Sequence, residues 1–294
     1  MIIFSDLHAH PFQALGEDRL DITMSVLRSI LTSARTSNVP VLFAGDIVHK
    51  HGYVPTLVIT ELIKIFKEFF DVQVYAISGN HDQATKNYLA APADSFITTL
   101  DAALDNFYCI DYKVVQIGEY RVVGIPYMAS SDDFYTLLDA IPAFDGKSIL
   151  LAHQTPTYLL NEFIPTQIDL NYEGFHAFDF VFLGHIHKYQ KLYGEMYMVG
   201  NPCVQDEGDA GDAKGYLEIV LGKVDRVILS TPLDITCLES KQEKIDAAKT
   251  YTKTDVVDER LYSENFEEKF DAYCEINKLS ADHIAVGKTI INQI

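Results

Sequence analysis

The stretch MIIFSDLH at residues 1–8 decides how the whole chain is interpreted. Its first four residues are apolar and predict a short buried strand, which passes directly into Asp6 and His8. In α/β proteins, ligand sites form at the carboxyl ends of parallel strands. Because one Asp-x-His pair occurs often by chance, a functional interpretation requires that the pattern recur.

The pattern recurs four times, each time after an apolar run. The further stretches are VLFAGD at 41–46, YAISGNHD at 75–82, LLAH at 150–153 and FLGHIH at 182–187. Each carries carboxylate, amide or imidazole side chains at its end, and the last carries two imidazoles two residues apart. The sequence therefore predicts that five strands deliver these side chains to one end of one sheet.

The segments between these strands indicate the fold class. Residues 18–37 and 56–70 carry apolar side chains at helical spacing, and strands that alternate with helices predict a largely parallel sheet covered on both faces. Residues 112–127, 191–200 and 215–230 are predicted as hairpins. The predicted fold is α/β, a β-sandwich of mixed sheets with βαβ units and flanking helices.

Composition divides the chain into three predicted parts. The boundaries are 1–231 for the main domain, 232–262 for a linker or vestigial cap, and 263–294 for a short C-terminal helical appendage. In the last part, Phe266, Phe270 and Tyr273 would form one apolar stripe of a helix. This stripe could bind a partner or pack back on its own domain.

The charge balance narrows the class of partner. The 294 residues include 42 acidic and 23 basic side chains, a formal net charge of −19. This balance argues against a free-standing binder of nucleic acid or anionic membrane, which usually presents a basic face. It is compatible with a nuclease, because metal ions offset acidic charge within a site.

The sequence also predicts a compartment. Its first residues form a strand rather than a basic and apolar leader, and no apolar run approaches the ~20 residues that span a bilayer. The four cysteines, Cys109, Cys203, Cys237 and Cys274, form no C-x-x-C pair. We therefore expect a cytoplasmic protein with reduced cysteines and no membrane association.

The residue types at the predicted strand ends suit a centre that holds two divalent metal ions. Mixed carboxylate, imidazole and amide donors favour manganese, iron or zinc over calcium. Two adjacent ions activate water and stabilise both the attacking and the leaving oxygen of a displacement at phosphorus. We therefore expect phosphoester hydrolysis with one of these three metals.

The five motifs, in this order, resemble those of the calcineurin-like metallophosphoesterases over residues 1–230. The resemblance implies two metal sites that share Asp46 as a bridge. The first site would use Asp6, His8, Asp46 and His187, and the second Asp46, Asn80, His153 and His185. His81 would be the acid that protonates the leaving oxygen.

Finer features resemble the SbcD family of DNA double-strand-break nucleases. These are His49, the His153-Gln154 pair, a hairpin around 198–202 and the strand start at 214–216. By this resemblance His49 would seat the substrate phosphate, and manganese would be the metal, with iron, zinc or magnesium as the alternatives. The chain would degrade duplex ends as a 3′-5′ exonuclease and cut single strands as an endonuclease, in DNA repair or recombination.

The SbcD resemblance also implies partners. These are a DNA substrate, an SbcC-type ATPase bound through the C-terminal helix, and a second copy of the chain that pairs through residues 87–105. The apolar side chains of that last segment are equally compatible with core packing.

Two other functions fit the same residues. One is a small-molecule phosphodiesterase or phosphatase of the same superfamily, which the acidic composition favours. The other is a non-catalytic scaffold, which the complete set of expected ligands argues against. His10 and His51 lie close to the motifs and are expected to be exposed loop residues, and the alternative is that they support the metal ligands from behind.

Overall fold

The computed structural model describes residues 1–11, 19–84, 94–142, 144–155, 175, 177–205, 209 and 213–229. All of them belong to one compact unit, Met1–Glu239, and a second unit spans Ser240–Ile294. The predicted linker at 232–262 and helical segment at 263–294 lie outside the described residues. These domain boundaries therefore stay predictions.

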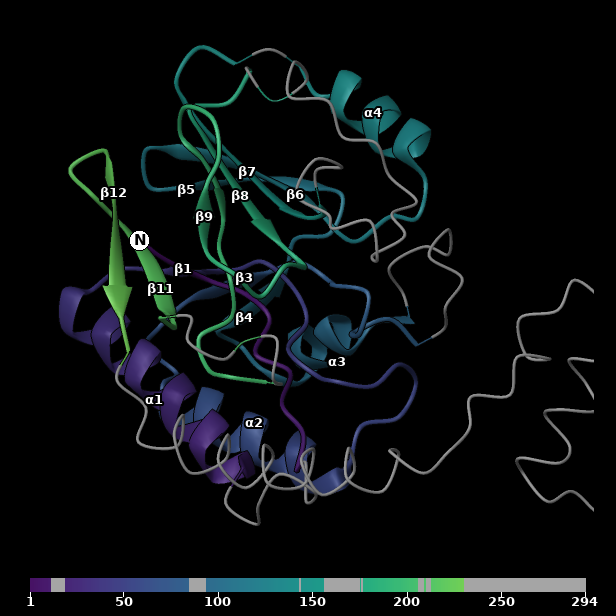
Figure 1. The fold of residues 1–294 in the computed structure, drawn as a ribbon, viewed down its shortest axis with the longest axis vertical. Helices are drawn as coiled ribbons and strands as arrows, with labels where there is room; N and C mark the ends of the chain where they lie inside the picture. The colour runs from purple at the N-terminus through teal and green to yellow at the C-terminus, as the bar shows by residue number, and fades with distance from the viewer. Residues whose placement is uncertain are drawn as a thin grey trace, which may run out of the picture. The chain divides into compact units, whose positions relative to one another are not determined.

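The described strands form two six-stranded sheets (Figure 1). The order in the first sheet is β12 (Lys223–Ile228), β11 (Gly215–Val220), β1 (Ile2–Phe4), β2 (Val41–Phe43), β3 (Val74–Ala76), β4 (Phe107–Cys109). The order in the second is β5 (Lys113–Ile117), β6 (Tyr120–Ile125), β7 (Lys147–His153), β8 (Phe180–Gly184), β10 (Met196–Met198), β9 (Gln190–Lys191). In each sheet four parallel strands are joined by antiparallel ones, which confirms the predicted α/β fold with mixed sheets.

The central strands are buried on both faces. In β1, Ile2 and Phe4 belong to the apolar cluster that includes the helices, whereas Ile3 belongs to the cluster between the sheets. Leu42 of β2 and Leu151 of β7 join Ile3 in that second cluster. Burial on both faces explains why these strands have continuous apolar sequences rather than alternating ones.

Helices cover the outer faces of the sandwich (Figure 1). α1 (Arg19–Ser37), α2 (Thr56–Glu68) and α3 (Phe96–Ala103) pack on the first sheet, and α4 (Ser131–Asp139) packs on the second. The helices predicted at 18–37 and 56–70 are thereby confirmed. Within the described part of the chain, no helix is both long and apolar enough to cross a bilayer.

The segment predicted to form a dimer contact is described only from residue 94 onward. There Phe96, Ile97 and Leu100 of α3 are buried in the core. Residues 87–93 of that segment lie outside the described residues. Core packing accounts for these three side chains, and the homodimer stays a prediction.

The expectation that the five motif strands share one sheet is wrong. β1, β2 and β3 belong to the first sheet, whereas β7 and β8 belong to the second. The β5–β6 hairpin starts the second sheet, because β5 pairs with β6 and not with β4. Apolar runs predict strands but not which strands pair, so the sequence alone did not separate the sheets.

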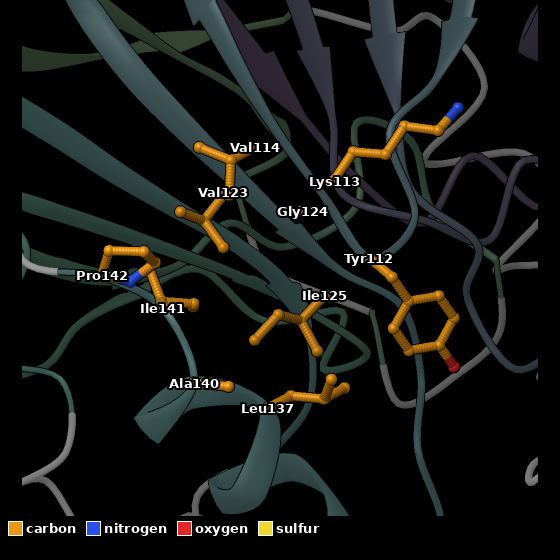
Figure 2. A pocket seen from close by; sticks show the side chains of 10 residues that line it. All are labelled: Tyr112, Lys113, Val114, Val123, Gly124, Ile125, Leu137, Ala140, Ile141 and Pro142. Atoms are coloured by element: carbon orange, nitrogen blue, oxygen red, sulfur yellow. The ribbon is translucent and has the colours of Figure 1, made fainter.

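A pocket of about 200 Å³ opens between the β5–β6 hairpin and α4 (Figure 2). Val123, Ile125, Leu137 and Ile141 give it an apolar lining. The ammonium group of Lys113, on its rim, donates to the carbonyl oxygen of Cys109 at 2.7 Å. The predicted metal ligands do not line this pocket.

Phe182 tests the importance of packing between the sheets. Its side chain is fully buried, and its ring stacks with those of Phe180 and Tyr197 at centroid distances of 6.3 and 5.7 Å. We expect Phe182→Ala to lower the free energy of unfolding in urea by about 3–5 kcal/mol. In the matched control Phe70→Ala, the side chain is 76% exposed and the expected change is below about 0.5 kcal/mol. Equal effects in the two variants would contradict this description of the core.

Candidate metal centre

The predicted site residues lie at the ends of five strands or in the loops that follow them. Loops after β1, β2 and β3 carry Asp6, His8, Asp46, His49, Asn80 and His81, whereas His153 ends β7 and His185 and His187 follow β8. Both sheets therefore contribute to one place. The sheets meet there through His153 Nδ1, which donates to the carbonyl oxygen of Ala44 at 2.6 Å.

Four of the predicted ligands have a left-handed backbone. The φ angles are 53° at Asp6, 46° at His8, 63° at Asp46 and 94° at His185. For residues other than glycine this conformation costs about 1–3 kcal/mol, and it concentrates at functional sites.

One group of donors consists of Asp6, His8 and His187, whose ligand atoms lie within 4.8 Å of one another. His8 Nε2 lies 3.8 Å from Asp6 Oδ1 and 3.1 Å from His187 Nε2. The backbone N–H of His185 donates to both Asp6 oxygens, at 3.2 and 3.1 Å, and so fixes that carboxylate.

A second group consists of Asp46, His153 and His185. His153 Nε2 lies 3.3 Å from Asp46 Oδ2 and 3.2 Å from Asn80 Oδ1, and His185 Nδ1 lies 2.9 Å from the same Asn80 oxygen. Asp46 Oδ2 is also 3.6 Å from His8 Nε2, in the first group. This carboxylate therefore lies between the two groups.

The chemistry of the donors fits two divalent cations. His153 Nδ1 carries a proton because a carbonyl oxygen can only accept, so Nε2 is the nitrogen turned to Asp46 and Asn80. Burial lowers the pKa of His185 to about 3 and the pKa of His8 well below its usual range, so both are neutral imidazoles. Imidazole nitrogens and carboxylate oxygens that lie this close together supply the lone pairs that a divalent cation binds.

His153 has the opposite electrostatic environment. Burial acts to lower its pKa, but the carboxylates of Asp46 and Asp6 and the Ala44 carbonyl outweigh burial and raise it to about 9. The same pairing acts on Asp46, whose pKa is lowered because His153 and His8 outweigh the effect of burial. His153 would therefore have to lose this proton before its Nε2 could hold a cation.

His81 and His49 lie together beside the donor groups. Their rings stack with a centroid distance of 5.5 Å, and one nitrogen of each lies within 4.8 Å of one on His8. The backbone N–H of His81 donates to Asp46 Oδ1 at 2.7 Å, and its Nδ1 donates to the carbonyl oxygen of His49. These contacts leave Nε2 as the nitrogen of His81 that can act on a substrate.

Asp82 is a functional residue that the sequence interpretation missed. Its buried carboxylate accepts the backbone N–H groups of Asp46, Ile47, Val48 and Gly79 at 2.7, 2.9, 3.2 and 2.9 Å. It therefore joins the loop that carries Asp46 to the loop that carries Asn80. Its position in the GNHD stretch was apparent from the sequence, but nothing in the sequence indicated which backbone N–H groups it would bind.

The glycine of that stretch is required for the same contact. A Cβ atom on Gly79 would lie 2.1 Å from Asp46 Oδ1 and 2.5 Å from the Asp46 backbone nitrogen. No side chain fits at this distance, so glycine allows the two loops to touch.

Asp209 is a second missed residue. Its buried carboxylate lies 3.5 Å from His187 Nδ1 and 3.1 Å from Lys214 Nζ, and it accepts from Asn201 Nδ2 and the Gln205 backbone at 2.7 Å each. Carboxylates in this position orient metal-binding imidazoles. The sequence drew attention to Lys214 but gave no reason to connect Asp209 with His187.

His10 and His51 are not the exposed loop residues that the sequence predicted. Both are half-buried. The ring of His10 lies 5.4 Å from that of His49, and the ring of His51 stacks on that of His81 at 5.0 Å. Both imidazoles therefore extend the histidine cluster of the site.

Comparison with known protein families gives one match that covers most of the chain. The family model described as calcineurin-like phosphoesterase matches residues 1–189. One similar solved structure is the crystal structure of TT1561 of Thermus thermophilus, with 12% identity, a TM-score of 0.48, and coverage of 77% of this chain and 97% of that one. No curated protein matched the chain.

Asp209 provides a test of how the centre is held. Asp209→Asn removes the charge that faces His187 and Lys214, and we expect it to weaken Mn²⁺ binding about 10–100-fold. Equilibrium dialysis with metal analysis measures the affinity. The matched control is Asp225→Asn on exposed β12, which should bind Mn²⁺ as the parent does. Parental affinity in a folded Asp209→Asn chain would contradict the orienting role.

Proposed function

This chain belongs to the calcineurin-like phosphoesterase family, and we propose that it acts as an SbcD-like DNA nuclease. The family membership makes the chain a metal-dependent hydrolase of phosphoester bonds. The proposal of a nuclease is carried by one observation: His49 and His81 stack beside the two donor groups, where a phosphodiester and its leaving group would lie.

Each residue then has a role in the reaction. The first donor group and the second, joined by Asp46, would hold two divalent ions, manganese being the one we expect. When bound, such ions activate water and neutralise charge on the phosphoester. His49 donates a hydrogen bond to a phosphate oxygen, and His81 Nε2 delivers a proton to the departing sugar oxygen.

Asp46 also positions the proton donor. Its Oδ1 accepts the backbone N–H of His81, while its Oδ2 faces His8 and His153. One carboxylate therefore fixes the distance between the donor groups and the acid. Proton transfer depends on such positioning, because the acid must be within hydrogen-bond reach of the leaving oxygen.

The acidic composition bears on how DNA would be held. A formal net charge of −19 gives little general attraction for a polyanion. We therefore propose that an SbcC-type ATPase supplies much of the contact with DNA, through residues 263–294, and that the nuclease works as a homodimer. Duplex ends would be degraded 3′-5′ and single strands cut internally, in repair or recombination in the cytoplasm.

A small-molecule phosphodiesterase is the second candidate. The same acidic composition favours it, because a small ester needs no extended basic surface. A scaffold without activity is disfavoured, because the candidate donors lie in two groups and His81, the proposed acid, lies beside them.

The role of His81 predicts a specific kinetic result. His81→Ala removes the proton donor but no donor of either metal group, so we expect kcat for bis-p-nitrophenyl phosphate to fall about 10²–10⁴-fold with two manganese ions still bound. The neighbouring variant Asn80→Ala should instead weaken metal binding. Unchanged kcat in His81→Ala would exclude the acid role, and loss of metal would make His81 a ligand.

The choice of substrate is tested by a parallel assay. The protein with Mn²⁺ is incubated at low salt with a labelled linear duplex that carries single-stranded tails, and separately with bis-p-nitrophenyl phosphate. Degradation of DNA that chelator and His81→Ala both abolish supports the nuclease. The second candidate is favoured if the small ester is hydrolysed and DNA is not. The same result must be obtained when an ATPase that co-purifies with the chain is added.

A further inference from the structure

Four imidazoles form a continuous row along the metal centre. The order is His10, His49, His81 and His51, with centroid distances of 5.4, 5.5 and 5.0 Å between successive rings. The two inner rings also contact His8, at 5.5 and 4.8 Å. Each outer ring contacts one ring of this inner pair, His10 that of His49 and His51 that of His81.

The backbone builds this row. The N–H of Ala9 donates to the carbonyl oxygen of Ile47 at 2.8 Å, and Ala9 pairs with Val48 in a parallel bridge. His10 and His49 are the next residues on the two paired segments, and this explains their neighbouring rings. Pairing of the first two motif loops therefore fixes one end of the row.

The other end depends on a tight turn. Gly52 follows His51 with φ of 61°, and a Cβ atom there would lie 2.6 Å from the carbonyl oxygen of Ala84. The turn therefore lies directly against the loop that carries His81. Glycine at this position allows His51 to stack on His81.

The row offers hydrogen-bond donors in an acidic protein. An imidazole carries at least one N–H whether it is neutral or protonated, so each ring of the row can donate a hydrogen bond to a phosphate oxygen. Lys50, between His49 and His51 in the sequence, adds one exposed positive charge.

We propose that His10 and His51 bind the phosphates on either side of the one that His49 and His81 contact, so that the site holds a polynucleotide strand. This inference rests on the proposed function, which places the inner pair at the scissile phosphodiester. A single ester occupies only the inner pair, whereas a strand presents further phosphate oxygens to the outer N–H groups. Phosphate contacts of this kind fix the register of a strand without reading its bases.

The test compares two inhibitors of one reporter reaction. Bis-p-nitrophenyl phosphate is hydrolysed by the manganese-loaded full chain in the presence of either thymidylyl-thymidine, which has one phosphodiester, or a short single-stranded oligodeoxythymidylate, which has many. The quantity measured is the ratio of the two inhibition constants in each variant. Changes in the reporter reaction itself cancel in this ratio.

Two substitutions at each position separate binding from packing. His10→Phe and His51→Phe keep a ring but remove the N–H donor, and each should raise the ratio of oligonucleotide to dinucleotide constants about tenfold, the loss of one hydrogen bond to a charged group. His10→Gln and His51→Gln supply an amide donor and should keep the ratio within about twofold of the parent, on the same reasoning.

Two results would overturn the inference: an unchanged ratio in both phenylalanine variants, or equal weakening of both inhibitors. Cleavage of the oligonucleotide is followed separately. A strand that binds through His10 and His51 but is not cut would support the inference and contradict the nuclease. A strand that is cut while the ratio of inhibition constants is unchanged would support the nuclease and contradict the inference.

Discussion

The contact between the Asp46 loop and the Asp82 loop is the constraint on which the site depends. Asp82 accepts three consecutive backbone N–H groups that begin at Asp46, and Asp46 Oδ1 accepts the backbone N–H of His81 in return. Gly79 lets the two loops approach closely enough for these bonds. The left-handed backbone at Asp46 is stable because these contacts outweigh its cost.

Sequence reasoning found the parts of this arrangement that depend on local pattern. Apolar runs located β1, β2, β3, β7 and β8, and the polar residues after them are the ones that the structure brings together. Sequence reasoning failed for the features that depend on which strands pair. The division into two sheets follows from β5 joining β6, and an apolar run of three to seven residues does not specify its neighbour.

The residues missed in the site have the same explanation. Asp82 binds the backbone amide of Asp46, which is distant in sequence, and Asp209 binds Lys214, which lies across a turn. An isolated aspartate in a sequence does not indicate such partners. His10 and His51 lie within two residues of motif histidines, so their positions were known. Their partial burial could not be predicted, because it depends on the Ala9–Val48 bridge and on the turn at Gly52.

Neither sheet holds a complete donor group. Asp6 and His8 come from the first sheet and His187 from the second, whereas Asp46 comes from the first and His153 and His185 from the second. A Cβ atom on Gly184 would lie 2.3 Å from both the Ala44 carbonyl oxygen and Ser5 Oγ, so the sheets approach as closely here as atoms allow. The apolar cluster that contains Ile3, Leu42 and Leu151 holds the two sheets together and so helps to set the distances between donors. Because a cation would bind only the packed sandwich, its binding energy adds to the energy that holds the sheets together.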